Sequence, residues 1–98
     1  MSKNLKAPDF QKYLAEQLKN PEIKKHYDEY GKQLEIAYQI LKLRKQKNIS
    51  QAQLAKKLKT KQSNIARIES GKQNLTLQTL DSIANILGVD WNISFQNK

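Results

Sequence analysis

The 98-residue sequence contains no cysteine, one histidine, two prolines and three glycines. Without cysteine, neither a disulfide bond nor a thiolate metal site is possible. The lone His26 stands beside Asp28 and Glu29, a setting more typical of a solvated side chain than of a metal ligand. We therefore expect a protein that needs no metal and no cofactor.

Long hydrophobic runs are also missing. No apolar stretch approaches the ~20 residues of a membrane-spanning helix. The N-terminal sequence MSKNLKAPDF lacks the apolar core of a signal peptide. We therefore expect a cytoplasmic protein without a membrane partner.

Acidic residues are almost absent between Lys42 and Lys72. This window holds ten of the 18 lysines and arginines but only one of the nine acids, Glu69, which leaves eight of each elsewhere. The net charge of +9 therefore lies entirely in the window. Solvated lysines usually alternate with acids, so this local excess favours a polyanionic partner, nucleic acid before membrane.

Apolar residues recur at helical spacing along most of the chain, which predicts a mainly α fold. We expect helices over residues 8–20, 21–47, 50–58, 61–71 and 76–88, the second being long or gently broken. Asn20, Ser50 and Thr76 are suited to cap three of them. Gly71 is suited to close the fourth helix as a left-handed cap. Ala52 and Leu77 are expected on buried helix faces.

The last segment changes to a period of two. Its apolar residues alternate with polar ones, a pattern typical of a short β-strand, and are Val89, Trp91, Ile93 and Phe95. A single strand cannot satisfy its own backbone groups. We therefore expect it to pair with the second subunit of a dimer or with another protein.

The two short helices joined at Lys59–Thr60 have the arrangement of a helix-turn-helix. In the second helix, Ile65 and Ile68 share one face and polar side chains occupy the others. Amide groups suit adenine and arginine suits guanine in the major groove. The predicted base-reading residues are Gln62, Ser63, Asn64 and Arg67, with Lys61 near a base edge or the backbone.

Residues 44–89 resemble the XRE (lambda-Cro-like) helix-turn-helix family. The matching motifs are Ser-Gln-x-x-Leu-Ala, Gln-Ser-x-Ile-x-Arg-Ile-Glu-x-Gly and Leu-x-x-Leu-x-x-Ile-Ala. The resemblance implies a five-helix-type XRE bundle over residues 33–88 that binds double-stranded DNA. Two such domains in a homodimer would read a palindromic operator, with recognition helices about 34 Å apart.

The same resemblance implies residues that anchor the domain. It places phosphate contacts at Gln51, Lys72, Gln73 and Asn74, and a structural salt bridge between Arg44 and Glu69. Three residues depart from the motif, and of these Leu75, in place of a common proline, has little consequence for DNA contact. Lys59 stands where the turn usually carries glycine. Lys61 stands where Ser or Thr usually caps the recognition helix, so Thr60 is an alternative cap that would shift the base contacts by one residue.

Residues 1–32 form a predicted N-terminal helical extension, here called the arm, and residues 89–98 a C-terminal strand. The Asn-Pro-Glu helix with tyrosines ahead of the XRE motif resembles HigA-type antitoxins. That resemblance implies neutralisation of a small basic RelE/HigB-type ribonuclease toxin and repression of the protein's own operon. The candidate toxin-binding residues are Phe10, Tyr13, Leu14, Leu18, Ile23, Tyr27 and Tyr30.

Alternatives remain at this stage. The first helix is too short to be stable alone, so its apolar face docks either on the protein's own long helix or on a partner. A stand-alone XRE-family repressor, whose arm only stabilises the fold, would share every motif. An enzyme such as a small nuclease is disfavoured, because no paired carboxylates, metal-ligand cluster or activated nucleophile accompanies the basic window.

Overall fold

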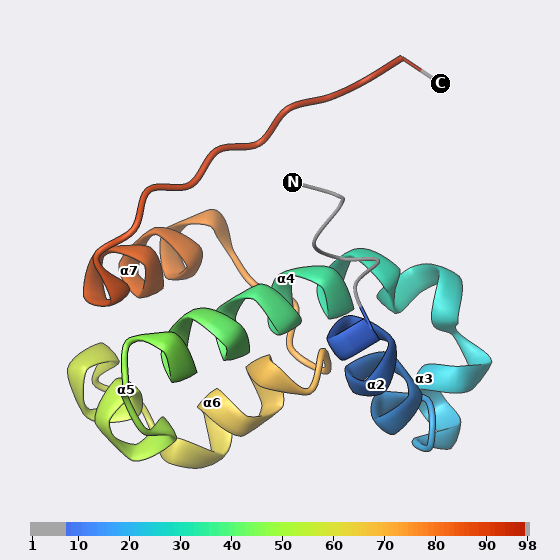
Figure 1. Cartoon of the computed structure of the whole chain (residues 1–98), viewed down its shortest axis with the longest axis horizontal. Helices are drawn as coiled ribbons and strands as arrows, with labels where there is room; N and C mark the ends of the chain where they lie inside the picture. The colour runs from blue at the N-terminus through green and yellow to red at the C-terminus, as the bar shows by residue number, and fades with distance from the viewer. Residues whose placement is uncertain (1–7, 98) are drawn as a thin grey trace.

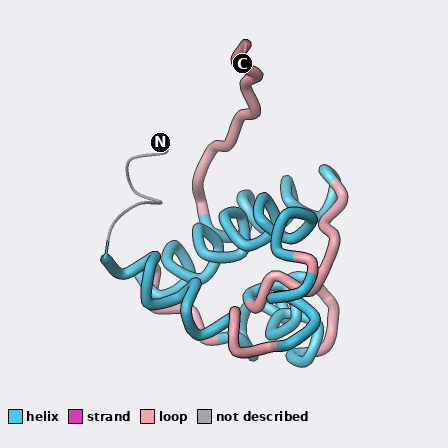
Figure 2. The backbone as a smooth tube through the Cα atoms, turned by 90° about the vertical axis from the view of Figure 1, so that its right-hand side faces the viewer, coloured by secondary structure: helices cyan, strands magenta, loops and turns pink. Residues whose placement is uncertain are grey.

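A computed structural model describes residues 8–97, which form six α-helices and no β-strand (Figures 1 and 2). The helices are α2 (Pro8–Gln17), α3 (Pro21–Lys25), α4 (Tyr27–Gln46), α5 (Gln51–Leu58), α6 (Gln62–Glu69) and α7 (Leu77–Leu87). Helix α4 runs across the molecule and contacts α2, α3, α6 and α7 (Figure 1). Residues 1–7 of the predicted arm and residue 98 lie outside the described residues. Within residues 8–97, no helix combines the length and apolarity needed to cross a membrane.

Side-chain caps begin three of the helices, at the residues that the sequence indicates. The Asn20 side chain accepts hydrogen bonds from the first turn of α3. Ser50 forms a capping box with Gln53 at the start of α5. Thr76 accepts the backbone N–H of Thr79 in α7. Each cap satisfies N–H groups that have no partner inside the helix.

Helices α4 to α7 all end in the same way. A residue with positive φ follows each helix, and the next backbone N–H bonds five residues back, which is the Schellman arrangement. The four positive-φ residues are Asn48, Lys59, Gly71 and Gly88. The expected left-handed cap at Gly71 is thus present. At Lys59 the φ of 61° costs on the order of 1–2 kcal/mol, because a side chain is crowded in this conformation.

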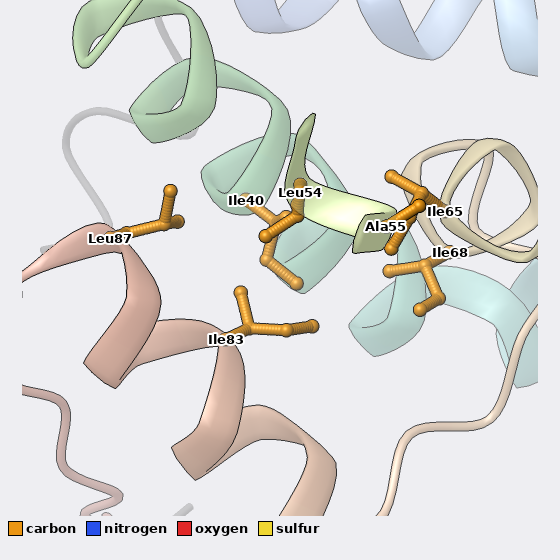
Figure 3. Close-up of a cluster of buried hydrophobic side chains, with 7 residues drawn as sticks. All are labelled: Ile40, Leu54, Ala55, Ile65, Ile68, Ile83 and Leu87. Carbon is orange, nitrogen blue, oxygen red and sulfur yellow. The ribbon is translucent and has the colours of Figure 1, made fainter. Parts of the chain in front are cut away.

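Two apolar clusters form the interior. The first joins α4 to the helix-turn-helix and contains Ile40, Leu54, Ala55, Ile65, Ile68, Ile83 and Leu87, whose side chains point toward one another (Figure 3). The second joins the arm to the first half of α4 and contains Phe10, Tyr13, Ile23, Leu34, Ala37 and Tyr38. Helix α4 contributes to both clusters, so it connects the arm to the predicted helix-turn-helix.

The predicted C-terminal strand is wrong. Residues 89–97 form no strand and lead away from the helices after α7 (Figures 1 and 2). Val89 and Trp91 remain half-buried near α7, whereas Ile93 and Phe95 are 57% and 96% exposed. The alternating pattern lacks a neighbouring strand within the described chain, and an unpaired strand has no ladder hydrogen bonds to stabilise it.

Other helix predictions need smaller corrections. Of the two forms expected for the second helix, long or gently broken, the structure shows the broken one: His26 ends α3 and begins α4, while Gly31 lies inside α4 without a break. Helix α2 ends at Gln17, before the expected Asn20. Ala52 and Leu77 are exposed, because the buried stripe of α5 is confined to Leu54 and Ala55 and Leu77 lies at the very first position of α7.

Candidate nucleic-acid interface

Helix α6 has one buried face and one polar outer face. Ile65 and Ile68 are 0% and 1% exposed, so they fix the helix against the core. The predicted base-reading side chains lie on the other faces: Lys61, Gln62, Ser63 and Arg67 are exposed and Asn64 is half-buried. The helix therefore presents amide, hydroxyl and guanidinium groups outward.

The start of α6 settles which residue caps it. The helix begins at Gln62, and Lys61 is its N-cap residue without a side-chain cap hydrogen bond. Thr60 does not take over the cap, since it lies one residue before the N-cap position. Its hydroxyl instead accepts the Asn64 side-chain N–H at 3.1 Å. This bond fixes the orientation of the Asn64 amide and leaves its oxygen as the free end.

A shallow depression follows the outer face of α6. It is lined by Lys59, Thr60, Lys61, Ser63, Asn64, Arg67 and Gln73. The structure thus brings four predicted base-reading residues together with Gln73 of the following loop, whereas Gln62 lies outside the lining. Sequence reasoning did not assign Lys59 or Thr60 to this surface, although both belong to the turn that precedes α6. The described lining has three basic side chains and no carboxylate, which suits a polyanion.

A buried ion pair connects α4 to α6. The Arg44 guanidinium donates to both carboxylate oxygens of Glu69, at 2.5 and 2.9 Å, and to the Ile49 carbonyl at 2.8 Å. Arg44 and Glu69 are 7% and 4% exposed. The Gln51 side chain also donates to Glu69, at 3.0 Å, which fixes it at the N-terminus of α5. Backbone N–H groups at such an end favour phosphate.

Most of the charge of the basic window therefore faces solvent without a paired acid; the exception is Lys42, whose Nζ lies 3.6 Å from Oδ2 of Asp9 in α2. Arg44 and Glu69 neutralise each other inside the protein. Of the window's ten bases and one acid, nine bases and no acid remain. The predicted phosphate-binding residues Lys72 and Asn74 are exposed and Gln73 is half-buried.

The loop after α6 is held by α4. Gln33 donates its side-chain N–H to the Gly71 carbonyl at 3.0 Å. Gly71 has a φ of +80°, and a Cβ atom there would lie 2.5 Å from Cδ2 of Leu34. Only glycine fits both the backbone conformation and the space, so the direction in which residues 72–74 leave the helix is fixed.

The apolar face of the arm packs on the protein's own α4. Among the candidate toxin-binding residues, Phe10, Tyr13 and Ile23 are buried, whereas Leu14, Leu18 and Tyr30 are half-buried. Tyr27, at 42% exposed, is the most accessible of the seven. Of the two docking alternatives left open by the sequence, the structure shows the internal one.

Three aromatic rings and one carboxylate define the contact between α2 and α4. The Phe10 and Tyr13 ring centroids lie 5.1 and 5.4 Å from that of Tyr38, whose hydroxyl bonds to the Asp9 carboxylate. Burial, together with this hydrogen bond, raises the pKa of Tyr38 to about 12. The same bond lowers the pKa of Asp9 below its usual range. Burial and the nearby Glu69 charge raise the pKa of Tyr13.

The bundle and the outward polar face of α6 define a helix-turn-helix protein of the DNA-binding class. The chain belongs to the Helix-turn-helix family (HTH_3), which matches residues 40–93. The XRE-type resemblance is therefore confirmed, and the match indicates a sequence-specific DNA-binding regulator of transcription. No curated protein and no solved structure matches the chain.

Proposed function

We propose that this regulator binds a palindromic operator as a homodimer, with the polar face of α6 in the major groove. The observation that carries the proposal is that Ser63, Asn64 and Arg67 lie together on the outer face of α6, in a depression whose lining also includes Lys59 and Lys61. An α-helix fits the major groove, where amide and guanidinium groups distinguish base pairs. Lys72, Gln73 and Asn74, together with the start of α5, then contact phosphates on either side.

An apolar cleft supports the homodimer. A cavity of about 190 Å³ lies between α4, α7 and the C-terminal segment. Ile93, which lines the cavity, and Phe95, two residues further along the chain, expose large apolar side chains. Contact with a second copy would cover these groups, and in that contact we place Val89, Trp91, Ile93 and Phe95.

Arg67→Ala and Lys72→Ala separate base reading from phosphate binding. We expect Arg67→Ala to remove discrimination of about 1–3 kcal/mol at one base pair. Lys72→Ala should weaken binding to all sequences equally and lower the salt slope by about one unit. Titrations of operator and random duplexes at several salt concentrations measure both effects. Lys24→Ala, an exposed change on α3 that removes the same charge, is the control. Equal losses on operator and random DNA for Arg67→Ala would contradict its role.

We further propose that the regulator is a HigA-type antitoxin that neutralises a small basic RelE/HigB-type ribonuclease and represses its own operon. The start of α3 supports this proposal, because Asn20 caps the helix and Pro21 begins it, as the Asn-Pro-Glu motif of the resemblance implies. Tyr27 is exposed beside the exposed acids Asp28 and Glu29. An apolar ring flanked by carboxylates is complementary to a basic protein surface.

A stand-alone repressor is the second candidate. The packing of Phe10, Tyr13 and Ile23 on α4 favours it, because most of the arm's apolar face is already used inside the chain. The two candidates differ in one partner, a basic protein encoded beside this chain.

Co-expression with the adjacent reading frame decides between them. For an antitoxin, we expect the neighbouring protein to arrest growth alone, and this chain to co-purify with it and restore growth. Tyr27→Ala should then reduce the rescue at least tenfold while operator binding stays within twofold, because Tyr27 lies outside both clusters. Gln46→Ala, exposed on the same helix, is the control. A neighbour that neither binds nor arrests growth leaves the stand-alone repressor.

A further inference from the structure

One hydrogen bond links the arm directly to the recognition helix. The Tyr13 hydroxyl in α2 donates to the backbone carbonyl of Glu69, the last residue of α6, at 2.7 Å. The two residues are 56 positions apart and the bond is buried. It therefore closes a long-range contact between the N-terminal extension and the DNA-binding element.

The bond completes the C-terminal end of α6. The Schellman bonds use the carbonyls of Arg67 and Ile68, which accept the N–H groups of Lys72 and Gly71. The next carbonyl, that of Glu69, accepts the Tyr13 hydroxyl. The last carbonyls of a helix have no partners within it, and a buried one needs an external donor. The arm supplies that donor.

Packing of the Tyr13 ring fixes the position of its hydroxyl. Tyr13 is 8% exposed, and its ring lies 6.1 Å from that of Phe10 and 5.4 Å from that of Tyr38. A ring held on two sides in a close-packed cluster has little freedom to follow a moving acceptor. The Tyr13 hydroxyl therefore holds the C-terminal end of α6 at a fixed position relative to the arm.

This point lies between the two parts of the proposed DNA interface. Arg67 stands two residues before Glu69, and Lys72 and Gln73 follow three and four residues after it. If the Glu69 carbonyl lost its donor, it would have to reach another partner or water, and either change moves the end of α6. Because Arg67 and the loop extend from that end, their positions relative to each other would change too.

We propose that Tyr13 is a positioning residue for operator recognition, so that the arm is a working part of the DNA-reading surface. The proposal rests on the proposed reading of bases by α6. Tyr13 does not touch DNA in this scheme. It holds the helix end so that the guanidinium of Arg67 and the loop after Gly71 engage the duplex together.

Tyr13→Phe tests the proposal, because it removes the hydroxyl and keeps the ring. The probe is a duplex that the wild-type protein selects from a random library, compared with a random duplex of the same length. We expect the ratio of the two affinities to fall about three- to tenfold, the range for a lost buried hydrogen bond. Affinity for the random duplex should stay within twofold, since no charge changes. Backbone amide resonances of residues 70–74 should shift.

Tyr38→Phe is the matched control. It removes a second tyrosine hydroxyl from the same aromatic cluster, but one that bonds to Asp9 in α2 and not to α6. For Tyr38→Phe, the ratio of affinities for the selected and random duplexes should stay within twofold of the wild-type ratio. All titrations are made at a temperature below the melting temperatures of the three proteins. An unchanged ratio for Tyr13→Phe, or an equal fall for Tyr38→Phe, overturns the positioning role. If the wild-type protein selects no sequence, base reading by α6 is itself wrong, and the inference fails with it.

Discussion

Replacing Arg44 with methionine is expected to lower the free energy of unfolding by about 3–5 kcal/mol, the usual cost of removing one partner from a buried ion pair. Glu69, at 4% exposed, would keep its carboxylate inside the protein with only the Gln51 amide as a side-chain donor among the described residues. The Ile49 carbonyl would lose its donor as well. Melting temperature should fall by more than about 10 °C for a domain of this size.

Two controls define the origin of this loss. Lys45→Met removes a positive charge from the neighbouring position of α4, which is exposed, and is expected to change stability by less than about 0.5 kcal/mol. A double variant, Arg44→Met with Glu69→Leu, removes both charges and should recover most of the stability. Thermal and denaturant unfolding measure all three. A single Arg44→Met variant that melts within a few degrees of wild type would show that the carboxylate is not buried as described.

The ion pair also explains why the proposed DNA-binding surface along α6 has no carboxylate among its described lining residues. Glu69 is the one acidic residue between Lys42 and Lys72. Its carboxylate is buried and accepts hydrogen bonds from Arg44 and Gln51. In the same residue, the backbone carbonyl accepts the Tyr13 hydroxyl. Glu69 therefore connects α2, α4 and α5 to the end of α6, and a change in any of these contacts bears on the recognition helix.

Local patterns were sufficient to predict the helix-turn-helix. The capping residues Asn20, Ser50 and Thr76, and the pair Ile65 and Ile68, act within one or two helical turns, so their roles follow from spacing alone. The polar outer face of α6 follows from the same periodicity, because a helix fixed by one apolar face must expose the other.

Contacts between distant parts of the chain were not predictable in this way. No periodicity relates Tyr13 to Glu69 or Leu34 to Gly71, and both contacts depend on how the arm and α4 pack. The arm's apolar spacing did indicate a docking face, but spacing does not say which surface it meets. The C-terminal pattern failed for a related reason: alternation describes a strand only when a second strand is present.

Gly71→Ala is the other change with a large expected effect, because two separate penalties act at one atom. The φ of +80° costs an alanine on the order of 1–2 kcal/mol. The new Cβ atom would also meet Leu34, 2.5 Å from Cδ2 and 3.1 Å from Cγ. Leu34 is 0% exposed, so its side chain cannot move into solvent, and such overpacking costs about 1–3 kcal/mol. We expect a total loss of about 2–5 kcal/mol by denaturant unfolding.

The other two glycines separate the penalties. Gly88 has a similar φ of +70° with no described atom within 4 Å of a Cβ, so Gly88→Ala should cost only the backbone strain. Gly31 lies inside α4, also with open space, and Gly31→Ala should stabilise the protein by up to about 1 kcal/mol. From most to least stable, the expected order is therefore Gly31→Ala, wild type, Gly88→Ala and Gly71→Ala. If Gly71→Ala and Gly88→Ala lose equal stability, Leu34 does not confine the start of the loop, and the fixed direction of residues 72–74 has to come from the Gln33 hydrogen bond alone.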